Sequence, residues 1–177
     1  FTNECLSLDI NGIENASVNK LLKKRDIARN LEALNAIGAI EFKEAQDLDN
    51  ALKLLPVLFE QHIKIWAGKR EQSMFLKNEN REFFIKLFSE LFQKGMIKLW
   101  ALKLNEKTIA TEVGFDYNKK YLTYYHTYEL EHAKSGPGTI IISHIIRKCL
   151  QNGFKEVDFS RGNEVYKHRF ANKFTSN

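Results

Sequence analysis

The sequence has little cysteine and no long apolar segment. Its two cysteines, Cys5 and Cys149, lie far apart in the chain, which excludes a disulfide framework and is typical of a reducing compartment. No apolar run approaches the roughly 18 residues that a membrane-spanning helix requires, and nothing resembles a signal peptide. We therefore expect a cytoplasmic protein without a membrane span.

The signatures of several enzyme classes are also missing. The chain has no G-x-S-x-G elbow, no P-loop and no dinucleotide-binding fingerprint. Its five histidines show no metal-ligand spacing with the cysteines, so no metal site is expected. Without repeats or low-complexity segments, the 177 residues suit one domain of ordinary size.

Positive charge is in excess, with a formal net charge of +5 and basic clusters at 20–29 and 167–169. Such an excess favours anionic partners, namely nucleic acid, phosphorylated cofactors or acidic glycans. The alternative for the first cluster is a solvated helix face. Because the aromatic residues follow core spacings and form no stacking platform, nucleic acid is not the partner we expect.

Apolar spacings of three and four predict helices in the first half of the chain. Ser17 can cap a helix that Gly38 ends, and 39–43 is a strand candidate. Asp47 begins a second helix, which Pro56 should kink or divide. A third helix ends at Gly95, and its packed face should include Phe83, Phe84, Leu87, Phe88 and Leu91.

From residue 96 the apolar period changes to two. Strands at 96–104, 108–115 and 121–128, joined by short polar connections, predict an antiparallel meander. A helix at 139–151 and a strand at 155–160 follow, and this crossover makes the last strand parallel to 121–128. A final helix should start near Asn163. The order predicts an α/β fold with helices on both faces of a mixed sheet.

The turn Ser135-Gly136-Pro137-Gly138 precedes the isoleucine-rich helix that begins at Thr139. Helix N-termini attract anions, and glycines allow successive amides to point at one ligand. No Asp or Glu occupies the first turn of this helix, as a phosphate site would require. The alternative is an ordinary glycine-proline turn before a buried helix.

Five segments together carry a family resemblance. They are the basic helix 24–31, the His62-to-Trp66 helix, the strand–turn–strand 102–110, the turn 135–138 and the segment 158–167. In this order they resemble the acetyltransferases associated with cellulose and exopolysaccharide biosynthesis (CelD/BcsL-like), a family of the GNAT superfamily. The resemblance covers about Ser17 to Lys167.

The resemblance implies a GNAT fold, in which two parallel strands, here 121–128 and 155–160, splay apart. Acetyl-CoA or another acyl-CoA would enter between them as co-substrate, with its pantetheine on the edge of strand 121–128, Tyr128 included. Its pyrophosphate would lie on Ser135, Gly136, Pro137, Gly138 and Thr139. Where the usual motif has Arg or Gln, this chain has Ala133.

The resemblance also bears on domains and acceptor. Family members often carry two GNAT-like units, so we expect one domain at 17–177, with residues 1–16 as the tail of a preceding unit or linker. The acyl group would pass directly to an amine or hydroxyl of a sugar, nucleotide-sugar or lipid-linked acceptor.

Acyl transfer needs a base, a polarised carbonyl and a proton for the leaving thiolate. Candidates for these roles are Glu112, His126, Asp158, Tyr166 and Lys167. Glu112 interrupts an apolar strand, and strand alternation puts His126 on one face with Leu122, Tyr124 and Tyr128. The others lie on or just after strand 155–160, where open sheets bind ligands.

Each candidate has a plainer alternative: a solvent-facing or packed residue for Glu112 and His126, and an ion pair of Asp158 with Arg161 or Lys167. The Tyr166-Lys167 pair also resembles Fem-type aminoacyltransferases, which use aminoacyl-tRNA; the basic first helix would then face RNA phosphates. A third possibility is a GNAT-like binding module without catalysis.

Overall fold

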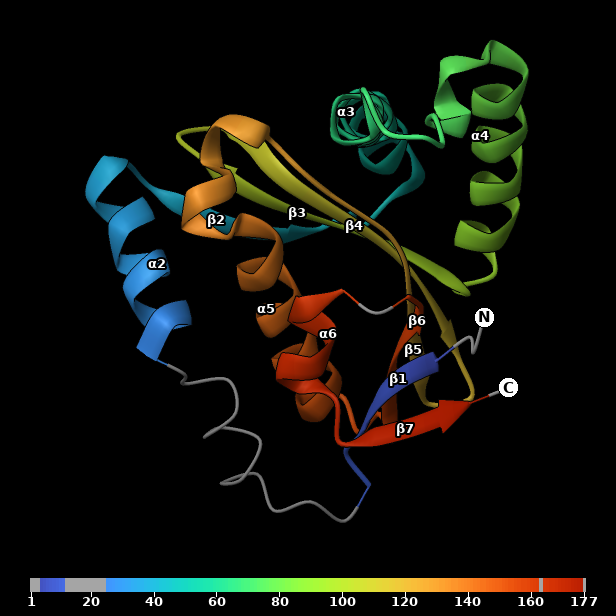
Figure 1. Ribbon diagram of the computed structural model, residues 1–177. Coiled ribbons are helices and arrows are strands. Elements are labelled where there is room, and N and C mark those ends of the chain that lie inside the picture. The colour runs from blue at the N-terminus through green and yellow to red at the C-terminus, as the bar shows by residue number, and fades with distance from the viewer. Residues whose placement is uncertain (1–3, 12–24, 163, 177) are drawn as a thin grey trace.

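The computed structural model describes residues 4–11, 25–162 and 164–176, which form one seven-stranded sheet with helices on both faces (Figure 1). The strands, in sheet order, are β2 (Ile40–Glu44), β3 (Ile97–Leu104), β4 (Lys107–Tyr117), β5 (Lys120–Tyr128), β6 (Glu156–Arg161), β1 (Glu4–Asp9) and β7 (Lys173–Ser176). All neighbours are antiparallel except β5 and β6. The predicted mixed sheet with one parallel pair is confirmed.

Two layers of helices enclose the sheet (Figure 1). On one face lie α3 (Leu48–Trp66) and α4 (Asn78–Gln93), with the short 3-10 turn η1 (Met74–Leu76) between them. Their core includes Leu55, Phe59, Phe75, Phe84 and Phe88. On the other face lie α2 (Arg25–Ile37), α5 (Pro137–Gln151), which follows the 3-10 turn η2 (Leu130–Ser135), and α6 (Val165–Phe170). Their core includes Leu34, Ile141, Ile145, Phe159 and Phe170.

Two details of α3 and α4 differ from expectation. Helix α3 starts at the predicted cap, where the Asp47 carboxylate accepts the Asn50 N–H at 2.8 Å, but Pro56 does not divide it. Losing one helical hydrogen bond is offset by the buried stripe on both sides of the proline. In α4, Phe83 was placed on the packed face and is instead 63% exposed, whereas Phe84 and Phe88 are buried.

Helix α3 is tied to the sheet by Gln61, which is fully buried. Its side-chain oxygen accepts hydrogen bonds from the hydroxyls of Thr127 at 2.9 Å and Thr111 at 3.3 Å. Its amide nitrogen donates to the Thr108 carbonyl at 3.2 Å. A buried amide satisfied in this way fixes the position of α3 against β4 and β5.

A β-bulge changes which side chains share a face of β5. The pairing of β4 with β5 shifts between Val113 and Gly114. As a result Tyr121 packs in the core beneath α5, whereas Tyr125 packs with α3 and α4. Regular alternation along a strand would put Tyr121 and Tyr125 on the same face, and it fails here because a bulge adds one residue to one strand.

The sheet also contains two strands that apolar periodicity did not reveal. Strand β1 pairs with both β6 and β7, so residues 4–9 belong to the same sheet as the rest of the domain. The expected origin of this segment in a preceding unit stays a prediction. The expected Ser17 cap and the expected helix start at Asn163 lie outside the described residues; α6 begins at Val165.

Candidate active site

Strands β5 and β6 are paired only at their beginnings. Their parallel register runs from Lys120 opposite Glu156 to Leu122 opposite Asp158 and goes no further. Beyond this point the two strands part, and no strand among residues 4–11, 25–162 and 164–176 pairs with this edge of β5 from Thr123 to Tyr128. A cleft opens in this gap, between the carboxyl ends of parallel strands, where open α/β sheets bind ligands.

The end of β6 is turned towards the cleft by an unusual backbone conformation. Ser160 has φ of 62°, in the left-handed region that non-glycine residues rarely adopt. The Asp158 carboxylate accepts the Ser160 N–H at 2.8 Å and supports this conformation. Phe159, Ser160 and Arg161 consequently all line the cleft, although regular strand alternation would turn one of them away.

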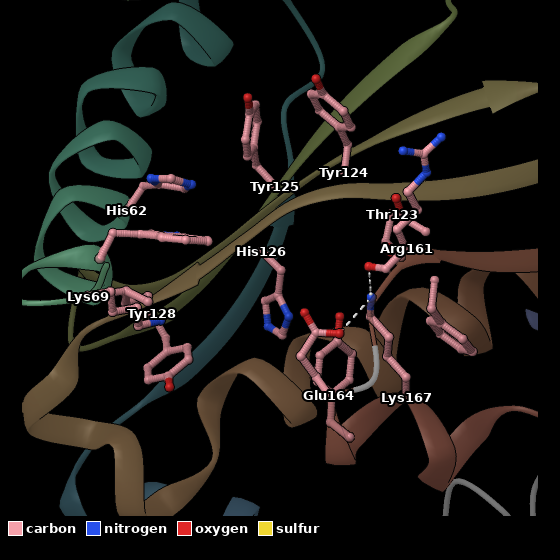
Figure 2. A pocket seen from close by; sticks show the side chains of 15 residues that line it. His62, Lys69, Thr123, Tyr124, Tyr125, His126, Tyr128, Arg161, Glu164 and Lys167 are labelled. Atoms are coloured by element: carbon pink, nitrogen blue, oxygen red, sulfur yellow. Dashed lines mark hydrogen bonds and ion pairs between the residues drawn. The ribbon is translucent and has the colours of Figure 1, made fainter. Parts of the chain in front are cut away.

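The cleft has two compartments. The central compartment, of about 420 Å³, extends from the β5–β6 gap to the end of α3 (Figure 2). The turn compartment, of about 290 Å³, lies at the N-terminus of α5 and is lined by Ala133, Gly136, Pro137, Gly138, Thr139 and Val165. His126, Tyr128 and Tyr166 line both compartments and therefore stand at their junction.

The turn before α5 has two main-chain amides that no backbone carbonyl of the described residues engages. Gly136 adopts a left-handed conformation with φ of 57°, and its N–H donates a hydrogen bond to the Ala133 carbonyl at 3.0 Å. No backbone carbonyl of the described residues accepts a hydrogen bond from the N–H groups of Gly138 and Thr139, and the Gly138 backbone interacts with the His126 ring. Pro137 and Gly138 are buried against the junction, and a Cβ placed on Gly138 would run into the His126 ring.

His126 and Tyr166 meet at the junction, with ring centroids 5.1 Å apart. Burial lowers the pKa of His126 to about 4, helped by the charge of Lys167 and opposed by the Gly138 backbone and Glu164. Its Nε2 is shielded from solvent and has no hydrogen-bond partner among the described residues. Burial, with the nearby carboxyl groups of Glu112 and Glu164, raises the pKa of Tyr166. At neutral pH the imidazole is therefore neutral and the phenol keeps its proton.

Lys167 is almost completely buried, with 3% exposure, yet it is well satisfied. Its Nζ donates to the Arg161 carbonyl at 2.6 Å and lies 2.8 Å from the Glu164 carboxylate (Figure 2). The lysine thus joins α6 to the end of β6 and keeps Glu164 at the cleft wall. Buried charges persist when they are paired in this way.

Glu112 lies beneath the junction rather than in it. In the sheet register it is opposite His126, fully buried, with neither carboxyl oxygen bonded to any described residue. Burial raises its pKa well above the ordinary value, against the opposing effects of the Tyr124 backbone and the Lys167 charge. A carboxyl group in this environment keeps its proton to higher pH than an exposed glutamate does.

The structure brings most of the predicted site residues together. His126, Tyr128, Gly136, Pro137, Gly138, Thr139, Tyr166 and Lys167 line the cleft. Ser135 and Asp158 do not line it, and Glu112 is sealed below it. The ion pair that we considered for Asp158, with Arg161 or Lys167, is not the one formed: its carboxylate lies 3.7 Å from Lys120 Nζ.

Part of the central compartment had no counterpart in the predicted site. Its far wall is the end of α3 with the following loop, and it contributes His62, Trp66 and Lys69. Tyr124 and Tyr125 of β5 complete this wall. The spacing of four between His62 and Trp66 was a signal, since it places both on one face of a helix, but core packing accounts for such a pattern equally well.

Residues 4–11, 25–162 and 164–176 contain no group of three or more histidine, cysteine or acidic side chains arranged for a metal ion. Among the same residues, no helix is long and apolar enough to cross a membrane.

The fold resembles several solved structures. The C-terminal domain of a protein assigned as a lysylphosphatidylglycerol synthetase from Agrobacterium fabrum superposes with a TM-score of 0.68 and 11% identity, over 99% of this chain and 59% of that one. FemX gives 0.66 and 10%, over 95% and 57%. A predicted acetyltransferase from Clostridium acetobutylicum, solved with acetyl-CoA, gives 0.51 and 12%, over 67% and 79%. The chain thus spans less than two thirds of the first two proteins.

Sequence comparison gives a family but no individual relative. No protein of curated function matches the chain. The family model described as "Acetyltransferase (GNAT) domain" matches residues 23–168, which include the turn, both splayed strands and α6 up to His168. With this match over most of its length, and with the GNAT fold, the chain belongs to the acetyltransferase (GNAT) domain family.

Proposed function

We propose that this domain transfers an acetyl or other acyl group from acyl-coenzyme A directly to an amine or hydroxyl of an acceptor. The observation that carries the proposal is the junction of the two compartments, where His126 and Tyr166 meet 5.1 Å apart between centroids. One compartment has the features of a donor site, and the other has room for an acceptor.

The turn compartment fits the phosphates of the donor. The amides of Gly138 and Thr139, which no backbone carbonyl of the described residues engages, lie at the positive end of the α5 dipole, and the first turn of α5 has no acidic residue. The glycine permits close approach, because a larger residue would fill the space beside His126. The free edge of β5 from Thr123 to Tyr128 can pair with the pantetheine amides as an added strand would. Ala133 contributes no side-chain hydrogen bond, so recognition falls to the backbone.

The chemistry at the junction is a proton exchange around direct acyl transfer. The acceptor nitrogen or oxygen attacks the thioester carbonyl, a bond to carbon forms, the carbon–sulfur bond breaks, and the acceptor loses one proton while the thiolate gains one. The neutral His126 ring can take the acceptor proton, and Glu164 stabilises the imidazolium that results. The Tyr166 phenol keeps its proton and can give it to the thiolate.

Lys167 and Asp158 have supporting roles in this scheme, outside the proton transfers. Lys167 holds Glu164 and the end of β6. Glu112 remains a candidate base, but its carboxyl group would need access to the cleft that this geometry does not give. Asp158, directed away from the cleft, acts through the backbone of Ser160.

For the acceptor we propose a sugar, nucleotide-sugar or lipid-linked sugar in polysaccharide biosynthesis, handled in the cytoplasm. The support is the resemblance to exopolysaccharide-associated acetyltransferases. Aminoacyl-tRNA is the alternative donor, suggested by the FemX-like fold and by the resemblance of the Tyr166-Lys167 pair to Fem-type aminoacyltransferases. Charged tRNA is therefore the competitor to include in donor-binding experiments.

The decisive experiment compares two substitutions at Thr139, which lines the turn compartment. Thr139→Asp puts a negative charge where the pyrophosphate would lie, whereas acidic residues in a first helical turn stabilise the fold. Thr139→Asn introduces a side chain of the same size as aspartate but without the negative charge. We expect calorimetry to show saturable CoA binding by the native chain and Thr139→Asn, and at least about tenfold weaker binding by Thr139→Asp. Equal affinity of the two variants, or binding of charged tRNA alone, would remove the acyl-CoA assignment.

A further inference from the structure

The central compartment has more positive charge than its own residues neutralise. The charged side chains that line it are Lys69, Arg161, Glu164 and Lys167. Glu164 and Lys167 form an ion pair with each other at 2.8 Å. Within residues 4–11, 25–162 and 164–176, neither Lys69 nor the Arg161 guanidinium has a carboxylate partner. Two unmatched cations therefore line one compartment.

The backbone of Arg161 is held in place, while its side chain is exposed. The buried Lys167 ammonium donates to the Arg161 carbonyl at 2.6 Å. The preceding residue, Ser160, is fixed in its left-handed conformation by Asp158. An arginine on a fixed stem loses less freedom on binding, and its planar fork matches the two oxygens of a phosphate or carboxylate.

Lys69 approaches from the opposite wall. Its ammonium lies over the Trp66 ring, 4.7 Å from the centroid, and this cation–π contact keeps the charge beside the compartment. Figure 2 shows Lys69 on the α3 side of the cleft and Arg161 on the β6 side, next to Tyr124. A ligand between the two walls would meet a positive charge on each.

We propose that the central compartment binds an acceptor that carries an oxyanion, a phosphate or a carboxylate, near its reacting amine or hydroxyl. Arg161 is the principal contact and Lys69 the second. The inference rests on the proposed function in one respect, since it takes the compartment beyond the His126–Tyr166 junction as the acceptor side. A neutral acceptor would leave both cations without a partner in the complex.

The test uses two simple probes, inorganic pyrophosphate for phosphate and citrate for carboxylate. Each is titrated calorimetrically into the full chain at constant ionic strength with saturating CoA, so that the turn compartment is already filled. We expect saturable binding of at least one probe, weakened about tenfold or more by Arg161→Gln. Arg161→Lys should restore part of it, since it keeps the charge but not the fork.

The matched control is Arg147→Gln, which removes the same charge from an exposed position on α5 outside both compartments. It should bind the probes as the native chain does. Absence of saturable binding of both probes, or equal weakening by Arg147→Gln and Arg161→Gln, would overturn the proposal. Binding of pyrophosphate would indicate an acceptor with a phosphate, and binding of citrate would indicate an acceptor with a carboxylate.

Failure of the donor assignment can be told apart from failure of this proposal. The same titrations are repeated without CoA on Thr139→Asp, in which the turn repels anions. Arg161-dependent probe binding to this variant would support the oxyanion site even if CoA never binds. CoA binding without any probe binding would overturn the oxyanion site and leave the donor assignment intact.

Discussion

Glu112 and His126 lie opposite each other across β4 and β5, and the Glu112 carboxyl group is fully buried without a hydrogen-bond partner among the described residues. Its raised pKa makes stability depend on pH in a definite sense. In the unfolded chain the carboxyl ionises near its ordinary pKa, whereas in the fold it keeps its proton to higher pH. The stabilisation is present in acid and is lost as pH rises.

Glu112→Gln removes this dependence, because a neutral amide of the same shape has no ionisation to suppress. We expect the variant to gain melting temperature relative to the native chain between pH 4.5 and pH 8, by about 2–4 °C for each kcal/mol involved. Thermal unfolding at both pH values measures it. Glu71→Gln, at an exposed loop position, is the control and should show no such trend. A relative loss for Glu112→Gln at pH 8 would contradict the buried neutral carboxyl.

Histidines should produce the opposite dependence on the acid side. Burial lowers the pKa of His62, His126 and His144, each to about 4. Between the ordinary value of 6.5 and about 4, the unfolded chain binds protons that the fold does not, so stability falls as pH falls through this range. Each histidine can lower the free energy of unfolding by at most about 1.4 kcal/mol per pH unit in this range, and partial exposure reduces this loss.

His144→Phe tests the contribution of one histidine. The ring stacks on Phe42 with centroids 4.0 Å apart, a contact that phenylalanine can keep. Denaturant unfolding from pH 7 to pH 4 should show a shallower decline for the variant than for the native chain. Parallel declines would mean that His144 is protonated as readily in the fold as in the unfolded chain.

Tyr166→Phe should lower turnover and spare donor binding. It removes the phenol proton proposed for the leaving thiolate and keeps the ring against His126. General acid catalysis is typically worth 10²–10⁴-fold, so we expect kcat to fall at least about 100-fold. The dissociation constant for CoA, measured by calorimetry, should change less than about threefold, because the ring stays in place.

The pH profile offers a second check on Tyr166. Burial and nearby negative charge raise its pKa, so the phenol should stay protonated and native turnover should persist to the alkaline end of the assay. A loss of activity at the ordinary pKa of a tyrosine would indicate a solvent-exposed phenol instead.

The central strands and the parallel crossover were predictable because their patterns are local. Apolar residues with a period of two, short polar turns and one helix between two strands define the meander and β5–α5–β6. Strands β1 and β7 were not predictable in this way. Each depends on pairing between residues far apart in the sequence, as Cys5 with Arg161 and with Thr175 illustrates.

Those site residues that lie at the ends or edges of helices and strands could be predicted from the sequence. His126, Tyr166, Lys167 and the turn residues lie on a strand edge or at a helix start, and topology brings these together. The position of the Asp158 side chain was not predictable, because its carboxylate is directed to the Ser160 N–H and to Lys120, outside the cleft. The burial of Glu112 likewise depends on α5 packing over its strand, which no local pattern reveals.

Asp158 is therefore expected to act as a positioning residue, and its substitutions separate this role from catalysis. Asp158→Ala removes the acceptor of the Ser160 N–H, and the left-handed conformation of a non-glycine residue costs about 1–2 kcal/mol. We expect a stability loss of that order and weaker pyrophosphate binding, because Arg161 follows Ser160 directly. Glycine adopts the left-handed conformation without the Asp158 hydrogen bond. The double variant with Ser160→Gly should therefore recover most of the lost stability and most of the lost pyrophosphate binding.

Asp158→Asn refines the comparison, since its side-chain oxygen can still accept the Ser160 N–H while the charge facing Lys120 is lost. If the hydrogen bond is what matters, this variant should resemble the native chain in urea unfolding and in turnover. An activity loss as large as that of Asp158→Ala, not rescued by Ser160→Gly, would instead assign the carboxylate a part in the reaction. Because Asp158 contributes no surface to either compartment, recovery in the double variant is the outcome that the geometry favours.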